Sequence, residues 1–431
     1  MSEARPLLSL DDALVRLAAG ASAHRIVQTE LLSTFDALGR VLAQEVLSAL
    51  DVPPADNTSM DGYALRAGDV PVAATVLPVV QRIPAGVVGQ PLLPGTAARI
   101  FTGGQVPAGA DAVVMQEHCE ALADTDASAD ASADVGAGAG TGLGRVRINT
   151  VPVAGQWIRR TGEDVRQGAT VLHAGERLTP QALGLAASVG AAQLTVLRRP
   201  RVAIFSTGDE LMMPGEALRP GAIYNSNRFV LRGLAQAAGC EATDLGIVPD
   251  RLDATRDALR QAAEQHDLIV TSGGVSVGEE DHLKPAAQAE GQVEHWQMAI
   301  KPGKPLAYGS IRRSDGTSAL LVGLPGNPVS SFVTWLLAVT AVLRTLQGMP
   351  ASLPHGLPLR ADFDWPKPDK RREFLRVRLN AECGLELYAN QSSGVLTSAV
   401  WADGLLDNPP GRAIRRGDTV RFLPLSELVA R

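Results

Sequence analysis

Hydrophobic positions in the first fifty residues recur at spacings of three and four, from "SLDDALVRLAA" to "ALGRVLAQEVL". This spacing is typical of the buried face of an amphipathic helix, so we expect a helical or mixed segment there. Between Val52 and Arg147 the pattern changes to short apolar runs separated by proline and glycine, which predicts β-strands joined by turns. We therefore expect a β-rich domain at 51–147, inserted into a linking domain made of 1–50 and 148–180.

One run inside this β-rich domain has a very different composition. The letters "ADTDASADASADVGAGAGTGLG" run from Ala123 to Gly144 and contain almost no large apolar side chain. Such a run cannot bury enough surface to offset the entropy of ordering it. We expect it to form the disordered tip of a hairpin near 123–144.

Strand-like and helix-like patterns alternate in the second half of the chain. A helix is predicted at "TPQALGLAASVG", with Pro180 at its first position and Gly190 beyond its end. Short β-branched runs and helical runs then follow one another, which favours parallel strands joined by crossover helices. We expect a three-layer α/β domain with a mostly parallel sheet at 181–348 and a small C-terminal β domain at 349–431. The predicted fold class is therefore multidomain α/β.

The composition is that of a globular protein, with 45% hydrophobic and 20% charged residues among 431. A net charge of -6 gives no general electrostatic attraction for nucleic acid, so an anionic ligand would need a local cluster of cations. Cys119, Cys240 and Cys383 are too far apart in the sequence for a metal motif and are interpreted as reduced thiols.

Nothing in the sequence patterns predicts a membrane protein. The longest apolar stretch, which begins at Phe332, is shorter than the ~20 residues that cross a bilayer. The first residues lack the basic and apolar regions of a secretion signal. We expect a cytoplasmic protein with no membrane partner.

Three loops with unusual sequences follow predicted parallel strands: "STGDEL", "SGGVSVGEEDH" and "GLPGNPVSS". Ligands of open parallel sheets bind beyond the carboxyl ends of the strands, so these loops are expected to face one crevice. Gly273 and Gly274 would leave backbone amides open to phosphate oxygens. Asn327 would cap a helix that starts at Pro328 and presents its positive end to an anion. Each loop alone could be an ordinary turn; their convergence favours a binding site.

Charged residues in and near these loops indicate how an anion would be held. Asp209 and Asp281 would repel a phosphate unless a cation lay between them, and oxygen ligands beside phosphate suit Mg²⁺. The alternative is that both carboxylates face solvent or cap helices. Lys301 and Lys304 lie in the proline-stiffened turn "AIKPGKPLAYG", which predicts an oxyanion site rather than two solvated surface charges.

Two acidic segments of the first half allow two interpretations. "DNTSMDGYAL" contains Asp56, Asn57 and Asp61, and "TGEDV" contains Glu163 and Asp164. Either segment could be a simple turn or part of a site. Spacing alone does not decide between them.

The chain resembles the molybdopterin molybdenumtransferase family, MoeA in bacteria and the C-terminal domain of gephyrin in animals. The resemblance rests on seven segments in the family's order: "DNTSMDGYA", "IFTGGQVPAGADAVVMQE", "GEDV", "FSTGDEL", "TSGGVSVGEEDH", "AIKPGKPLAYG" and "GLPGNPVSS". It spans nearly the whole chain except the Ala/Asp/Gly run. It implies a metal-dependent enzyme of molybdenum cofactor synthesis that inserts molybdate into adenylylated molybdopterin and releases AMP.

The resemblance also assigns roles to individual residues. It implies that Asp209 and Asp281 bind the metal beside the pyrophosphate and that Lys301 and Lys304 face molybdate. Positions in the N-terminal half that match the family's functional residues are Asp61, Thr102 and Glu163. Those that would bind the substrates are Ser272, Gly273, Gly274, Ser276, Pro325, Gly326, Asn327, Pro328, Arg371 and Ser393, with Ser392 as the alternative to Ser393.

Partners are implied by the resemblance as well. The family forms an elongated homodimer whose site lies between the α/β domain of one subunit and the β domain of the other. The resemblance also implies that the molybdopterin adenylyltransferase and other proteins of the cofactor pathway are partners of this protein. Two other functions would use a related fold: a scaffold that binds partner proteins, as the gephyrin domain does, or the adenylyltransferase itself. The acidic and lysine motifs argue against the scaffold, and the long flanking regions argue against the adenylyltransferase.

Overall fold

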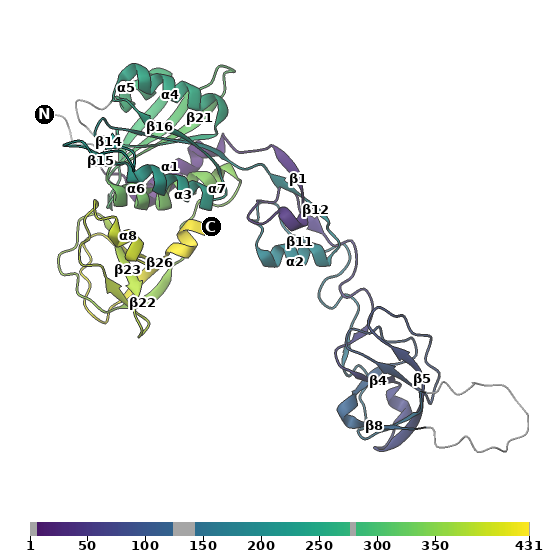
Figure 1. Cartoon of the computed structure of the whole chain (residues 1–431). Helices are drawn as coiled ribbons and strands as arrows, with labels where there is room; N and C mark the ends of the chain where they lie inside the picture. The colour runs from purple at the N-terminus through teal and green to yellow at the C-terminus, as the bar shows by residue number, and fades with distance from the viewer. Residues whose placement is uncertain (1–6, 124–142, 276–281, 431) are drawn as a thin grey trace, which may run out of the picture.

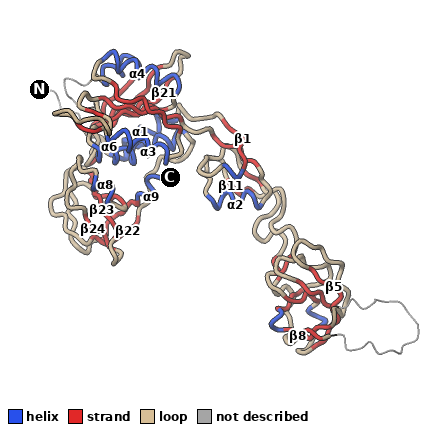
Figure 2. The backbone as a smooth tube through the Cα atoms, in the orientation of Figure 1, coloured by secondary structure: helices blue, strands red, loops and turns tan. Residues whose placement is uncertain are grey.

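The protein is an elongated molecule with three main sheets, which we describe from a computed structural model (Figure 1). The structure describes residues 7–123, 143–275 and 282–430. An α/β region and a C-terminal β region lie side by side, and a connecting segment leads from the α/β region to a distal β region at the far end. Figure 2 shows that strands dominate the distal and C-terminal regions and that most helices surround the central sheet.

The central sheet has six strands, of which the first four are parallel. Two antiparallel strands complete one edge, so the sheet is mixed with a parallel core, which confirms the predicted α/β class. In spatial order the strands are β16 (Glu241–Val248), β13 (Arg201–Thr207), β17 (Leu268–Ser272), β21 (Ser318–Leu324), β20 (Pro305–Arg312) and β18 (Gly291–Gln297).

Helices cover both faces of this sheet because alternate side chains of its strands point to opposite sides. Val202 and Ile204 of β13 pack into one core with the helices α1 (Leu10–Ser22), α3 (Ser226–Ala237) and 328–346. Ala203 and Phe205 pack into the other core with α4 (Leu252–Gln265) and α5 (Leu283–Glu290). The predicted three layers are therefore present.

The helix at 328–346 is longer than the apolar stretch from Phe332 suggests. It consists of α6 (Pro328–Thr334), a π-helical turn (Trp335–Val339) and α7 (Thr340–Leu346). By length and composition its 19 residues could cross a membrane, but 83% of its apolar window is buried inside the protein. Trp335 is 1% exposed in the core below the sheet. Burial in the core accounts for the apolar character of this helix.

The prediction of helix across both halves of the first fifty residues is only partly right. α1 forms as expected, and the Oγ of Ser9 accepts the Asp12 N–H at its start. The second half is instead β1 (Thr29–Ser33), a short 3-10 turn (Thr34–Asp36) and β2 (Val46–Leu47). Buried apolar residues there, such as Leu42, pack against strands and helices about 150 residues away in the sequence, so tertiary contacts override the local pattern.

The connecting segment consists of β1, β2 and β3 (Asn57–Thr58) with their partners from residues 158–197. β1 pairs with β12 (Gln193–Leu197), β2 with β11 (Thr170–Leu172), and β3 with β10 (Ile158–Arg159). α2 (Pro180–Ser188) begins as predicted, with the Thr179 Oγ1 accepting the Ala182 N–H and Gly190 at φ +85° just past its end.

The distal β region has its own six-stranded sheet. Its strands, in spatial order, are β7 (Ala112–Met115), β4 (Gly62–Leu65), β6 (Ala97–Ile100), β5 (Thr75–Ile83), β9 (Arg145–Ile148) and β8 (Cys119–Leu122). Two 3-10 turns, Ala67–Asp69 and Gln116–His118, join them. β8 and β9 pair antiparallel on either side of the Ala/Asp/Gly run. The predicted disordered tip itself falls largely on 124–142, outside the described residues.

The C-terminal β region is a small closed barrel. Its strands are β23 (Arg372–Leu379), β24 (Gly384–Leu387), β22 (Leu357–Ala361), β26 (Thr419–Pro424) and β25 (Gly404–Asn408), and β25 pairs back onto β23. The short strand β19 (Ile300–Lys301) adds to β23 in parallel, so the lysine turn of the α/β region is attached to the barrel. Helices α8 (Thr397–Trp401) and α9 (Leu425–Ala430) complete the region.

Candidate functional site

A cavity of about 990 Å³ opens at the carboxyl ends of the parallel strands, between the central sheet and the C-terminal barrel. Its wall combines the loops after β13, β17 and β21, the start of α3, the lysine turn and two segments of the barrel. The structure thus brings together many of the predicted site residues. Those that line the cavity are Ser272, Gly273, Gly274, Lys301, Lys304, Pro325, Gly326, Asn327, Pro328, Arg371 and Ser393, together with Ser392.

Three neighbouring strand ends are held close together around Gly273. Its N–H donates to the Leu324 carbonyl at 3.1 Å, and the Ser272 Oγ lies 3.0 Å from the Ser206 Oγ of β13. Gly273 adopts φ +90°, and a Cβ there would lie 2.8 Å from the Thr207 carbonyl oxygen. Only glycine fits this position without moving the adjacent strand end. The bare backbone of Gly273 and Gly274 therefore forms part of the cavity wall.

The loop after β21 is held by hydrogen bonds to its backbone. The Asn227 amide Nδ2 donates to the Gly326 carbonyl at 2.7 Å, and the Ser331 Oγ donates to the Pro325 carbonyl. Asn327 occupies the N-cap position of α6, but its side chain makes no capping hydrogen bond, so the predicted cap is wrong in this respect. Its backbone carbonyl accepts the Ser331 N–H instead.

Two cations of the cavity wall are paired with carboxylates of the C-terminal region. Lys301 Nζ lies 3.3 Å from Glu373 Oε1 and 3.4 Å from Asp369 Oδ2. Arg371 donates from Nε and Nη2 to the two oxygens of Asp369, both at 2.9 Å. These bonds from Arg371 hold the pKa of Asp369 far below its usual value, and the same carboxylate raises the pKa of Arg371. For Lys304, the described residues provide no carboxylate within ion-pair distance.

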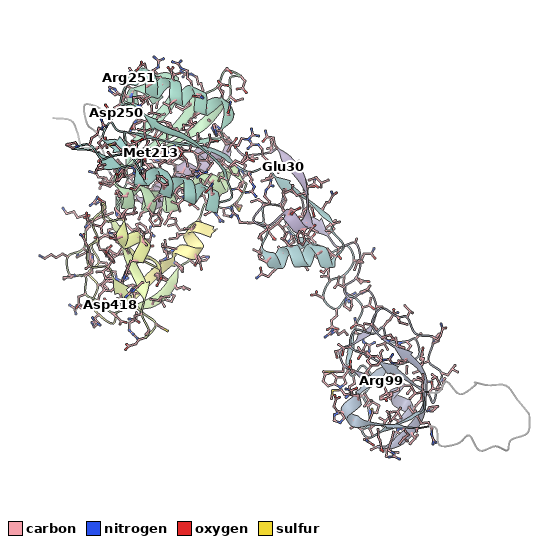
Figure 3. The ribbon with its side chains drawn as sticks, viewed as in Figure 1. Glu30, Arg99, Met213, Asp250, Arg251 and Asp418 are labelled. Carbon is pink, nitrogen blue, oxygen red and sulfur yellow. The ribbon has the colours of Figure 1, made fainter. Side chains whose placement is uncertain are left out.

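Acidic residues gather at the edge of the cavity beside the loop after β13. Glu210 lines the cavity, whereas Asp209 does not. The Oδ1 of Asp209 accepts the Asp250 N–H at 3.3 Å. Burial, followed by the charges of Asp209 and Glu210, raises the pKa of Asp250, which Figure 3 places on the α/β region. Among the described residues, none of these three carboxylates forms an ion pair, so negative charge is concentrated here.

The predicted metal pair cannot be completed from the described residues. Asp281 and Ser276 both lie outside them. Within the described ranges, no three His, Cys, Asp or Glu side chains are grouped closely enough to form a metal centre alone. Mg²⁺ commonly binds through one or two carboxylates with the remaining ligands from substrate phosphates and water, so the uncompensated acidic edge fits this ion.

The three predicted residues of the N-terminal half lie away from the cavity in the same chain. Thr102 donates from its N–H and its Oγ1 to Asp61 Oδ1, both at 2.7 Å, and these bonds lower the pKa of Asp61. Glu163 Oε2 accepts the Arg160 N–H at 2.8 Å. Figure 3 shows Arg99, whose charge also acts on Asp61, in the distal region, at the opposite end of the molecule from Asp250.

Several residues of the cavity wall were not predicted. One such segment runs from the last residue of the short strand β15 (Ile223–Tyr224) into the next helix: Tyr224, Asn225, Ser226 and Asn227. β15 pairs with β14 (Leu211–Met212). Asn225 is 1% exposed, and its Oδ1 accepts the Arg228 N–H at the start of α3. The polar triplet "NSN" between a strand and a helix was the available signal, but it indicated only the beginning of the helix.

Comparison with protein families shows three matches that together span most of the chain. Residues 8–190 match the MoeA N-terminal region (domain I and II), residues 203–345 a probable molybdopterin binding domain, and residues 358–425 the MoeA C-terminal region (domain IV). The cavity lies between the second and third of these matched regions.

Curated relatives and solved structures agree with these matches. The chain is 41% identical to the molybdopterin molybdenumtransferase of Haemophilus influenzae over 74% of each chain. It is 33% identical to that of Bacillus subtilis over 99% of this chain and 96% of the relative. A crystal structure of the molybdopterin biosynthesis moeA protein from Pyrococcus horikoshii OT3 superimposes with a TM-score of 0.78 at 26% identity, covering 97% of this chain and 99% of that one. As the seven sequence motifs predicted, the chain belongs to the molybdopterin molybdenumtransferase (MoeA) family, transferases of molybdenum cofactor biosynthesis.

Proposed function

We propose that this protein is a molybdenum insertase, which inserts molybdate into adenylylated molybdopterin and releases AMP. The observation that carries the proposal is the cavity: Lys301, Lys304 and Arg371 line it together with the bare backbone of Gly273 and Gly274. Cations suit an oxyanion, and open amides beside glycine suit phosphate oxygens. One cavity therefore offers binding groups for both anionic substrates.

The chemistry needs no nucleophilic side chain. Two anions repel one another in solution, so the residues that bind them together supply much of the rate by proximity. Gly273 and Gly274 would hold the phosphates, while Lys301, Lys304 and Arg371 would hold molybdate beside the dithiolene sulfurs. Lys301 and Arg371 are already oriented by their carboxylate partners, so little reorganisation of these two side chains is needed when charge shifts during the reaction.

We further propose that Asp209 and Asp281 bind Mg²⁺ at the acidic edge of the cavity. The grouping of Asp209, Glu210 and Asp250 supports a cation there, because burial and then the charges of Asp209 and Glu210 raise the pKa of Asp250. When bound, the ion would neutralise charge on the pyrophosphate and on the departing AMP. The negative charges of Glu210 and Asp250 would strengthen the electrostatic attraction between this edge and Mg²⁺.

The activity is expected to appear as AMP release that requires molybdate. The full-length protein would be mixed with adenylylated molybdopterin and Mg²⁺, and AMP would be measured with and without molybdate. The molybdopterin adenylyltransferase alternative predicts pyrophosphate release from ATP instead. A protein that releases AMP at the same slow rate at every molybdate concentration would contradict the insertase function and favour the scaffold alternative.

The positions of Asp61, Thr102 and Glu163 support a shared site in a homodimer. These residues are remote from the cavity of their own chain, yet the Asp61–Thr102 pair is well ordered by two hydrogen bonds. We propose that the distal region of one subunit completes the cavity of its partner subunit. The cytoplasm is the compartment that suits this reaction. A docked molybdopterin adenylyltransferase is the partner that suits it.

A shared site predicts complementation between two defective variants. Asp61→Ala and Lys301→Ala would each be expressed alone and then together, and AMP release would be compared at limiting molybdate. Mixed dimers would contain one site with both substitutions and one intact site, so co-expression should restore roughly a quarter of the wild-type sites. Mixed dimers isolated with two different affinity tags that show no more activity than the variants alone would contradict the shared site.

A further inference from the structure

Glu373 is a fully buried carboxylate directly behind the cavity wall. It lies on β23 of the barrel and is 0% exposed. Its Oε2 accepts the Trp365 indole N–H at 2.9 Å and the Asn408 amide N–H at 3.3 Å, and its Oε1 lies 3.3 Å from Lys301 Nζ. A buried carboxylate is costly unless it is both hydrogen-bonded and paired with a cation. Lys301 is therefore the charge partner that this position requires.

The backbone also fixes how Glu373 and Lys301 meet. β19 and β23 pair in parallel with Lys301 opposite Glu373. Lys301 is 39% exposed and lines the cavity, so its ammonium lies between a buried carboxylate on one side and the cavity on the other. The two donors to Oε2 come from different parts of the barrel, one before β23 and one at the end of β25, so the carboxylate cannot rotate away.

The second carboxylate near Lys301 differs in both exposure and bonding. Asp369 is 23% exposed, and both of its carboxylate oxygens accept hydrogen bonds from Arg371. Its Oδ2 lies 3.4 Å from Lys301 Nζ. Glu373 has no other cation within ion-pair distance among the described residues. Glu373 is thus the fixed partner of Lys301, and Asp369 mainly orients Arg371.

We propose that Glu373 is a positioning residue for the oxyanion site, which holds the Lys301 ammonium at the cavity wall before molybdate arrives. The inference rests on the proposed function, because it takes the cavity to bind molybdate. A preoriented ammonium binds an oxyanion without the entropy cost of ordering a flexible lysine side chain. The barrel would in this way contribute to molybdate affinity through a residue that never touches the substrate.

The test is molybdate binding by equilibrium dialysis with the full-length protein. In Glu373→Gln the amide oxygen can still face Trp365 and Asn408, while the amide NH₂ faces Lys301 and no longer attracts it. We expect the dissociation constant for molybdate to rise roughly tenfold, the effect of one lost charge-assisted contact. Asp407→Asn is the matched control: Asp407 is buried in the same barrel at 4% exposure but pairs with Arg372 and Arg421, outside the cavity wall. It should bind molybdate within about twofold of wild type.

A double-mutant cycle separates positioning from general damage to the barrel. If Glu373 acts through Lys301, then Glu373→Gln should cause no further loss of molybdate binding in a Lys301→Ala background. An equal loss in both backgrounds, or wild-type affinity in Glu373→Gln, would overturn the inference. Absence of any molybdate binding by the wild-type protein would overturn the proposed function and this inference with it, so the two failures are distinguishable.

A second variant covers the case in which Glu373→Gln does not fold. Trp365→Phe removes one donor to Oε2 without touching Lys301. Trp365→Phe should also raise the dissociation constant for molybdate, but only when Lys301 is present. Unchanged binding in Trp365→Phe, with the fold confirmed by circular dichroism, would count against a positioning role.

Discussion

Replacing Lys301 with alanine is expected to raise the molybdate concentration for half-maximal AMP release roughly ten- to hundredfold. The lost ammonium would have made hydrogen bonds to an oxyanion, and bonds to charged groups contribute about 1.5–3 kcal/mol each, where about 1.4 kcal/mol corresponds to a factor of ten. The same change leaves Glu373 buried without its cation, so the free energy of unfolding should also fall. Titration of AMP release against molybdate, together with denaturant unfolding, measures both effects.

Lys304→Ala is the control that separates binding from stability. Lys304 lines the same cavity, but the described residues offer its ammonium no carboxylate partner. We expect a higher molybdate requirement with little change in the free energy of unfolding. In Lys301→Ala, a second substitution Glu373→Gln should recover part of the lost stability, because it removes the unpaired buried charge. An unchanged molybdate requirement in Lys301→Ala would place the oxyanion site elsewhere.

The central sheet and its loops could be predicted because the signals for them are local. Each parallel strand is a short β-branched run, and each candidate loop follows one directly, as Gly273 follows β17. The general rule for parallel sheets then brings the carboxyl ends of such strands to one edge. Strand order was not needed for this step, so the loops after β13, β17 and β21 could be placed together before their spatial order was known.

The charge pairs behind the cavity could not be predicted, because they depend on contacts between distant segments. Asp369 and Glu373 appear in the sequence as part of a mixed run of charges, about seventy residues after Lys301. Only the pairing of β19 with β23 brings Glu373 beside Lys301. No local spacing indicates which carboxylate of such a run is buried and which stays exposed.

The first fifty residues show a different limit of sequence patterns. A spacing of three and four fits a helix, but it also fits a segment whose apolar residues are buried by several separate partners. Leu42 is 1% exposed because it packs between segments from residues 165–196; it forms an isolated bridge with Val196, and Val41 forms one with Arg177. Local periodicity therefore identified only some of the buried positions, since Leu38 and Leu47 are more than half exposed, and it predicted the wrong secondary structure for this segment.

Gly303→Ala is expected to lower the rate of AMP release roughly hundredfold, since a misplacement of about 1 Å can cost that much. Gly303 lies between the two lysines at φ +108°, and a Cβ there would lie 2.3 Å from the Thr334 Oγ1 of the buried helix α6. Thr334 is 0% exposed in the core, so we expect the lysine turn to shift away from the helix. Both lysines would then leave their positions in the cavity wall.

Gly316→Ala separates this displacement from the general cost of a left-handed backbone. Gly316 lies in the hairpin between β20 and β21 at φ +84°, and a Cβ there would meet no atom within 4 Å. It should lose about 1–2 kcal/mol of stability from its backbone conformation and keep its activity, whereas Gly303→Ala should lose about 1–3 kcal/mol more from overpacking. AMP release at saturating molybdate and thermal unfolding of both variants measure the difference. The added methyl group is expected to displace the turn that carries both lysines. Wild-type activity in Gly303→Ala would therefore contradict the requirement for an exact placement of Lys301 and Lys304.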